Sequence, residues 1–89
     1  MPNDTPTAAE IDAHFSAMDD SVNLINATVA DDSEALRNFG DASGVNLMIT
    51  RNTDHLEIQL ATDWAKDDSR DKTSYTAAIN AGKNYVANN

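Results

Sequence analysis

The feature that most constrains the fold of this chain is a regular line of apolar residues in its N-terminal third. The segment Thr7-Ala8-Ala9-Glu10 precedes this line and fits a capping box, in which the Thr7 hydroxyl and the Glu10 carboxylate each accept a backbone amide. The apolar residues recur at alternating spacings of four and three, which predicts a helix over residues 8–29 and is also the spacing of a coiled-coil seam. They are Ile11, Phe15, Met18, Val22, Ile25 and Val29.

The helical pattern breaks near residue 32. The seam requires an apolar residue at this position, but Asp32 occupies it. A single helix running on to Gly40 would measure about 48 Å, whereas a compact domain of this length is only about 30 Å across. We therefore expect a second, short helix over residues 32–39, capped through Asp31 and Glu34 and closed by Gly40.

Residues 45–61 predict a β-hairpin. Apolar and polar residues alternate here, as they do in a strand with one buried and one solvent-facing side. The two strands are expected over residues 45–50 and 55–61, joined by a four-residue turn over 51–54 and packed against helices. The apolar members of the alternation are Val45, Leu47, Ile49, Leu56, Ile58 and Leu60.

The C-terminal third predicts a last helix that starts near Thr73 or Ser74. The polar stretch before it begins either with a helical turn capped by Thr62 or with an extension of the second strand to Trp64. Glycine weakens a helix, so the place of Gly82 on the inner face indicates a close approach to a neighbouring element. That inner face contains Tyr75, Ala78, Ile79, Gly82 and Val86.

Together these elements predict a single α+β domain over residues 7–89, preceded by a disordered end over residues 1–6. The expected order is a long N-terminal helix, a short second helix, a two-stranded antiparallel hairpin and a C-terminal helix. The two longer helices are expected to cover one face of the hairpin. A chain of 89 residues is long enough for one domain and no more.

Charge excludes some classes of partner. The chain has a net charge of −9, from 15 acidic and 6 basic side chains. The acidic excess is concentrated in residues 1–44, where Arg37 is the only basic residue. Such a surface repels nucleic-acid phosphates and anionic membranes, so we expect neither direct nucleic-acid binding nor membrane binding.

No catalytic or metal-binding pattern is recognisable. The chain has no cysteine, and nothing at ligand spacing accompanies His14 or His55. Residues 67–71 begin like a calcium loop, but Lys72 stands where the turn glycine belongs. We therefore predict a protein that is not an enzyme and needs no cofactor or metal. Because no signal peptide or membrane-spanning run is apparent, a cytoplasmic location is expected.

The leading functional hypothesis is binding through the acidic half of the chain. A row of carboxylates on a rigid helix can imitate a phosphate backbone and occupy a basic surface of a protein partner. The concrete version is a phage or mobile-element inhibitor of a host nucleic-acid-handling complex, of the anti-CRISPR or anti-restriction type, although no motif connects the chain to such a family. The residues predicted to carry the binding are Asp12, Asp19, Asp20, Asp31, Asp32 and Glu34.

Two alternatives stay open at this level. The acidic surface can serve solubility alone, because an aspartate-rich and lysine-poor composition suits a high-salt environment. Alternatively, the protein is a structural or assembly protein whose copies form a homo-oligomer, such as a homodimer, through the hairpin edge or the seam of the first helix. Apolar spacing alone does not separate burial within the chain from pairing with another copy.

Overall fold

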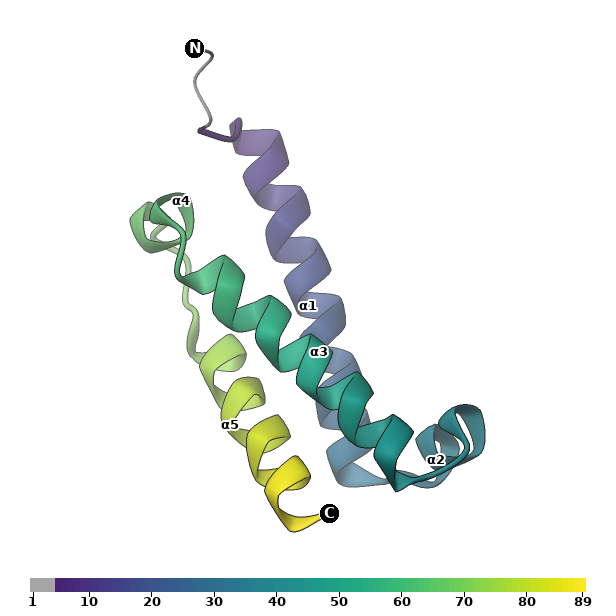
Figure 1. Cartoon of the computed structure of the whole chain (residues 1–89). Helices are drawn as coiled ribbons and strands as arrows, with labels where there is room; N and C mark the ends of the chain where they lie inside the picture. The colour runs from purple at the N-terminus through teal and green to yellow at the C-terminus, as the bar shows by residue number, and fades with distance from the viewer. Residues whose placement is uncertain (1–4) are drawn as a thin grey trace.

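The computed structural model describes residues 5–89, and in this range the chain forms five helices and no strand. Three long helices pack against one another in pairs, and two short helices lie at the connections between them (Figure 1). No helix in the described part of the chain is long and apolar enough to cross a membrane. The helices are α1 (Ala8–Ala30), α2 (Ser33–Phe39), α3 (Ala42–Leu60), α4 (Asp63–Asp67) and α5 (Thr73–Asn88).

The first helix begins as the sequence predicts and ends one residue later. The Glu10 amide donates to Thr7 Oγ1 at 3.2 Å, and the Thr7 amide donates to Glu10 Oε1 at 2.8 Å, which completes the capping box. These two hydrogen bonds satisfy amides that have no partner inside the helix. The buried face of α1 includes Phe15, Met18, Val22 and Ile25.

The predicted second helix is confirmed over residues 33–39, but its predicted cap through Asp31 and Glu34 is not, because the N-cap is Asp32 and its side chain makes no capping hydrogen bond. The chain leaves the helical conformation at Asp31, and α2 ends at Gly40, whose φ of 86° lies in the left-handed region. Only glycine adopts this conformation without steric cost, so Gly40 fixes the end of α2.

The predicted β-hairpin is wrong, and with it the α+β fold class. Residues 42–60 form the continuous helix α3, whose first turn is capped by a hydrogen bond of 2.9 Å from the Gly44 amide to the Asp41 carboxylate. Leu47 and Ile58, which the hairpin would have buried, are exposed instead. The residues that α3 buries are Val45, Met48, Ile49, Thr53 and Leu56.

The helical period of α3 is present in the sequence but disguised. Its buried stripe passes through Thr53, a polar residue in the middle of the segment that resembles a turn. The Thr53 hydroxyl is satisfied within the helix, because it donates to the Thr50 carbonyl at 2.9 Å. Residues 45–61 contain neither glycine nor proline, so nothing in the backbone interrupts the helix. The alternation at Leu56, Ile58 and Leu60 is therefore coincidental.

The C-terminal third contains two helices. The Ala65 amide donates to Thr62 Oγ1 at 3.3 Å and starts α4, which confirms the helical turn and excludes the extension of a strand to Trp64. The last helix begins at Thr73, as predicted. Its buried face carries Gly82, and a Cβ at this position would lie only 2.5 Å from Thr53 Cγ2 of α3. The predicted close approach is confirmed.

The apolar line of α1 is covered within the chain by α3 and α5. Its last member, Val29, is exposed, and Thr28 takes the buried place, with its hydroxyl donating to the Leu24 carbonyl at 2.9 Å. The hairpin edge does not exist, so the assembly hypothesis loses that interface. The disordered end predicted over residues 1–6 falls mostly on residues 1–4, which lie outside the described range.

Candidate functional site

Two of the six predicted binding residues hold α1 to the C-terminal part of the chain. Asp12 Oδ1 accepts from Arg70 Nη2 at 2.9 Å, and Asp19 Oδ1 accepts from the Tyr75 hydroxyl at 2.6 Å. Burial, together with this hydrogen bond, raises the pKa of Tyr75 to about 12. Both carboxylates therefore have a structural role, but only Asp12 is paired with a positive charge.

Arg70 connects Asp12 to an aromatic cluster. Its guanidinium carbon lies 4.0 Å from the centre of the Phe15 ring, and its Nε donates to Asp68 Oδ1 at 2.7 Å. The hydrogen bonds from Arg70 hold the pKa of the Asp68 carboxyl below its ordinary value. Trp64 stacks on the His14 ring at 5.0 Å and meets the Phe15 ring edge-on at 5.6 Å. The segment between α4 and α5 is thereby fixed to the first half of α1.

Asp32 has a comparable role at the other end of α1. Its Oδ2 accepts from the Tyr85 hydroxyl at 2.8 Å and so connects the junction of α1 and α2 to the end of α5. Burial and this hydrogen bond raise the pKa of Tyr85. Asp32 precedes α2, but its side chain makes no capping hydrogen bond to that helix.

The remaining three predicted residues, Asp20, Asp31 and Glu34, are exposed. Within residues 5–89, Asp20 forms no hydrogen bond or ion pair. Asp31 Oδ1 accepts from the Ser33 hydroxyl at 2.7 Å and from the Ser33 amide at 3.0 Å. These two hydrogen bonds lower the pKa of Asp31. Its carboxylate thus stays charged at neutral pH and is held in a fixed direction.

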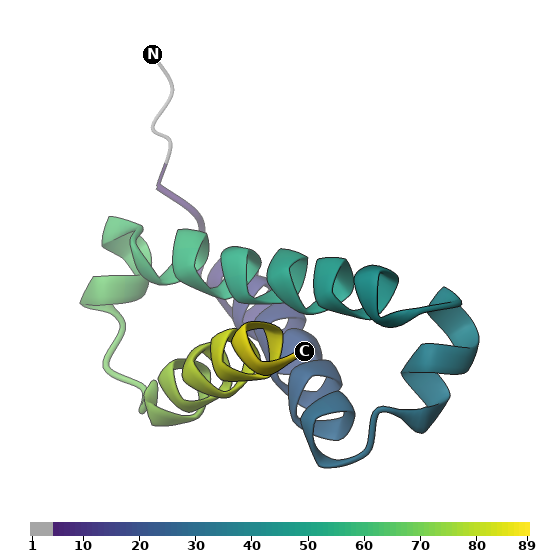
Figure 2. The ribbon, with the colours of Figure 1, turned by 60° about the horizontal axis from the view of Figure 1, so that its bottom comes forward.

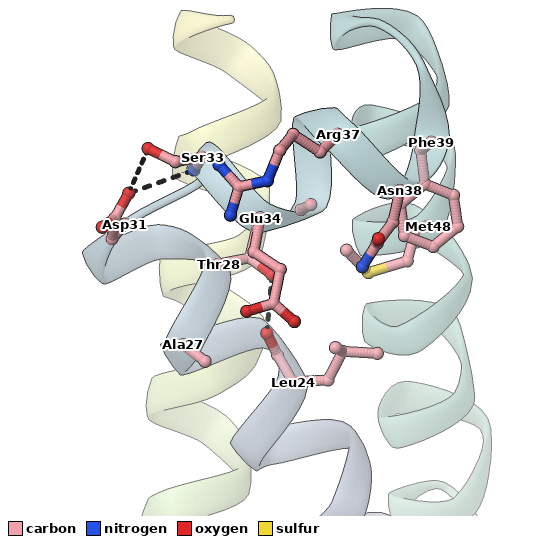
Figure 3. Close-up of a pocket in the computed structure, with 11 residues that line it drawn as sticks. Leu24, Ala27, Thr28, Asp31, Ser33, Glu34, Arg37, Asn38, Phe39 and Met48 are labelled. Atoms are coloured by element: carbon pink, nitrogen blue, oxygen red, sulfur yellow. Dashed lines mark hydrogen bonds between the residues drawn. The ribbon is translucent and has the colours of Figure 1, made fainter.

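Asp31 and Glu34 lie on the rim of a cavity of about 350 Å³ where α1, α2 and α3 meet, here called the corner pocket. Figure 3 shows Glu34 and Arg37 on one side of this pocket and Phe39 with Met48 on the other. The corner pocket is lined by Leu24, Ala27, Thr28, Asp31, Ser33, Glu34, Ala35, Arg37, Asn38, Phe39 and Met48.

Two large apolar side chains at the corner pocket are open to solvent. Leu24 is 42% exposed and Phe39 is 47% exposed. Exposed apolar groups next to a cavity with charged residues on its rim are typical of a surface that binds another molecule. The sequence did not predict this pocket, because its lining comes from three helices that only the tertiary structure brings together.

The structure also pairs a serine with a histidine, which the sequence analysis missed. Ser21 Oγ of α1 lies 3.0 Å from His55 Nδ1 of α3. Ser21 is buried, neither residue lines the corner pocket, and no carboxylate in residues 5–89 hydrogen-bonds to His55. This geometry lacks the third group that orients a catalytic histidine, so the pair acts as a hydrogen bond between helices.

In the described part of the chain, no group of three or more acidic or histidine side chains is placed to hold a metal ion. Two carboxylates of the calcium-like segment have other partners, because Asp68 binds Arg70 and Asp71 accepts from the Thr73 amide at 2.9 Å. No family model, curated protein or solved structure matches the chain. The function must therefore be inferred from the site itself.

Proposed function

We propose that this protein is a small, acidic, non-enzymatic binding protein that occupies a basic surface of a protein partner. The observation that carries the proposal is the corner pocket, where the carboxylates of Asp31 and Glu34 stand beside the exposed side chains of Leu24 and Phe39. Carboxylates attract and orient a basic surface, while apolar groups that lose contact with water supply affinity. Both kinds of group line the same pocket, together with Arg37.

The charge of the N-terminal half supports the same proposal. The hydrogen-bond donors to Asp19 and Asp32 are the hydroxyls of Tyr75 and Tyr85, which bring no positive charge to the surface. Among the six predicted residues only Asp12 forms an ion pair in the described structure. A partner approaching α1 and α2 therefore meets a field that remains strongly negative.

Exposed carboxylates on α1 and at its C-terminal end support the more specific version, an inhibitor of a host nucleic-acid-handling complex encoded by a phage or mobile element and acting in the cytoplasm. Asp20 is exposed on α1, and Asp31 is exposed at the C-cap of that helix, where two hydrogen bonds from Ser33 fix its carboxylate. Carboxylates fixed in this way can occupy a groove that otherwise binds a phosphate backbone.

The test begins with capture of the partner from a native host and uses the purified partner thereafter. The double variant Asp31→Asn with Glu34→Gln neutralises the rim of the corner pocket. The matched control, Asp63→Asn with Asp67→Asn, changes the net charge equally at two exposed residues of α4. Dissociation constants of both variants are measured by titration calorimetry over a range of salt concentrations.

The rim variant is expected to bind about tenfold more weakly or worse, and the control close to the unmodified protein. Affinity of the unmodified protein is expected to fall as salt rises, and the protein should displace duplex DNA from the purified partner. Equal losses in both variants would show that only total charge matters. An affinity that is insensitive to salt would contradict the proposed mode of binding.

A further inference from the structure

In the part of the chain that the structure describes, the outward face of α3 carries a row of solvent-exposed residues. Figure 2 shows α3 on one side of the molecule, with α1 and α5 both on its other side. Two large apolar residues nevertheless point away from the core on this helix. Leu47 is 50% exposed and Ile58 is 65% exposed, which makes Ile58 the most exposed large apolar residue in the described range.

The exposed apolar residues of α3 belong to a regular line. Leu47, Arg51, Asp54 and Ile58 follow one another at spacings of four, three and four residues, and all four are exposed. At 100° per residue they fall within an arc of about 60°, on the side of the helix opposite its buried residues. This is the spacing of a coiled-coil seam, and the four residues are here called the α3 seam.

The two charged residues at the centre of the α3 seam have no partner among the residues that the structure describes. Within residues 5–89, Arg51 and Asp54 form neither a side-chain hydrogen bond nor an ion pair. The nearby Glu57, by contrast, is bound by Lys83 of α5 at 2.8 Å. The seam therefore presents one free positive and one free negative charge between two apolar residues.

The α3 seam is complementary to itself when one copy is reversed. The midpoint between Leu47 and Ile58 coincides with the midpoint between Arg51 and Asp54, so one two-fold axis serves both pairs. Around such an axis, Leu47 of each copy faces Ile58 of the other. Arg51 of each copy likewise faces Asp54 of the other. Antiparallel pairing of two seams is therefore favoured in both shape and charge.

We propose that the outward face of α3 binds a second copy of this chain as an antiparallel, two-fold symmetric helix pair. Each interface contains two ion pairs at its centre, flanked by the apolar pairs. This proposal is independent of the proposed function, since the α3 seam and the corner pocket have no residue in common.

The expected association is weak. Helix α3 is about 28 Å long, so two such helices bury an area at the low end of specific interfaces. Each copy also carries a net charge of −9, which opposes association at low ionic strength. The expected dissociation constant at physiological salt is on the order of 100 µM.

The experiment uses two reciprocal charge variants, Arg51→Asp and Asp54→Arg, studied alone and mixed by sedimentation equilibrium. In the proposed pair each variant alone places like charges opposite each other, whereas the mixture restores two ion pairs. The variants shift the net charge in opposite directions, so a general charge effect would weaken one and strengthen the other. A third variant, Ile58→Ser, removes an apolar side chain from the seam. Its matched control is Val29→Ser, which removes an exposed apolar side chain outside the seam.

The unmodified chain and Val29→Ser are expected to dimerise, whereas each charge variant and Ile58→Ser should associate about tenfold more weakly or worse. The equimolar mixture of the charge variants should recover a dimer, and so should the double variant that exchanges the two charges. Circular dichroism checks that each variant remains folded. The proposal is overturned if the unmodified chain stays monomeric at about 1 mM in moderate salt. It is also overturned if each charge variant, studied alone, dimerises as strongly as the unmodified chain.

Discussion

Gly82 lies where α5 packs tightly against α3, and its replacement by alanine tests how tightly the three long helices are packed. A Cβ at this position would lie 2.5 Å from Thr53 Cγ2, 3.2 Å from Ile49 Cγ2 and 3.3 Å from Ile25 Cγ2. All three neighbours are buried, so none can move into solvent. Thr53 is further restrained, because its hydroxyl donates to the Thr50 carbonyl. The added methyl group therefore displaces one helix.

The magnitude follows from two opposing effects. Alanine favours a helix over glycine by about 1 kcal/mol, which alone would stabilise the protein. Overpacking a closely packed interior costs about 1–3 kcal/mol, and the 2.5 Å approach places Gly82→Ala near the upper end, at about 3 kcal/mol. The free energy of unfolding is therefore expected to fall by about 2 kcal/mol.

Urea denaturation followed by far-ultraviolet circular dichroism measures this change. The matched control is Ala77→Gly at an exposed position of α5, which loses only the helix preference of alanine, about 1 kcal/mol. A second substitution, Thr53→Ser, removes the methyl group that Gly82→Ala would meet, so the double variant should recover about 1 kcal/mol or more. If Gly82→Ala were as stable as the unmodified protein, the close packing of α5 on α3 would be wrong.

Two further predictions concern the contacts that hold α1 to the C-terminal part of the chain. The pKa of Tyr75 is raised to about 12 from its ordinary value of 10.0, so the folded state loses stability as pH rises between these values. Tyr75→Phe should weaken this alkaline loss, measured by urea denaturation at several pH values, and an unchanged pH profile would contradict the assignment. Arg70→Met removes the ion pair with Asp12 and should lower the urea midpoint by less than Gly82→Ala does. The decrease caused by Arg70→Met should be smaller in high salt than in low salt, because salt screens the ion pair. Lys66→Met, at an exposed residue of α4, is the control and should leave the midpoint nearly unchanged; equal effects of the two would count against a structural role for Arg70.

The sequence predicted the limits of α1 and α2 closely because their signals are local, and it predicted the start of α5. A capping box, a break in the apolar period and a glycine that adopts positive φ each act within a few residues, so no knowledge of the rest of the fold is needed. The turn capped by Thr62 was predicted for the same reason, as one of two alternatives. The hairpin was wrong because the helical stripe of α3 passes through Thr53, and burial of that residue depends on α5 rather than on its sequence neighbours.

The candidate site was predicted only in part. The sequence identified the acidic residues, but it did not distinguish carboxylates that bind the protein's own side chains from those open to a partner. Asp12, Asp19 and Asp32 each contact a residue more than fifty positions away in the chain. No local pattern signals such partners. The corner pocket and the hydrogen bond between Ser21 and His55 likewise join residues of different helices.

The sequence by itself determined the net charge, the limits of α1 and α2, the start of α5 and most of the apolar residues on the buried face of α1. These properties follow from composition and from hydrogen bonds within single turns. Only the tertiary structure decided that residues 42–60 are helical, which carboxylates remain open to solvent, and where Leu24 and Phe39 meet the acidic rim. The physical reason is that burial depends on which helices pack together, and a residue's exposure is a property of that packing rather than of its place in the chain.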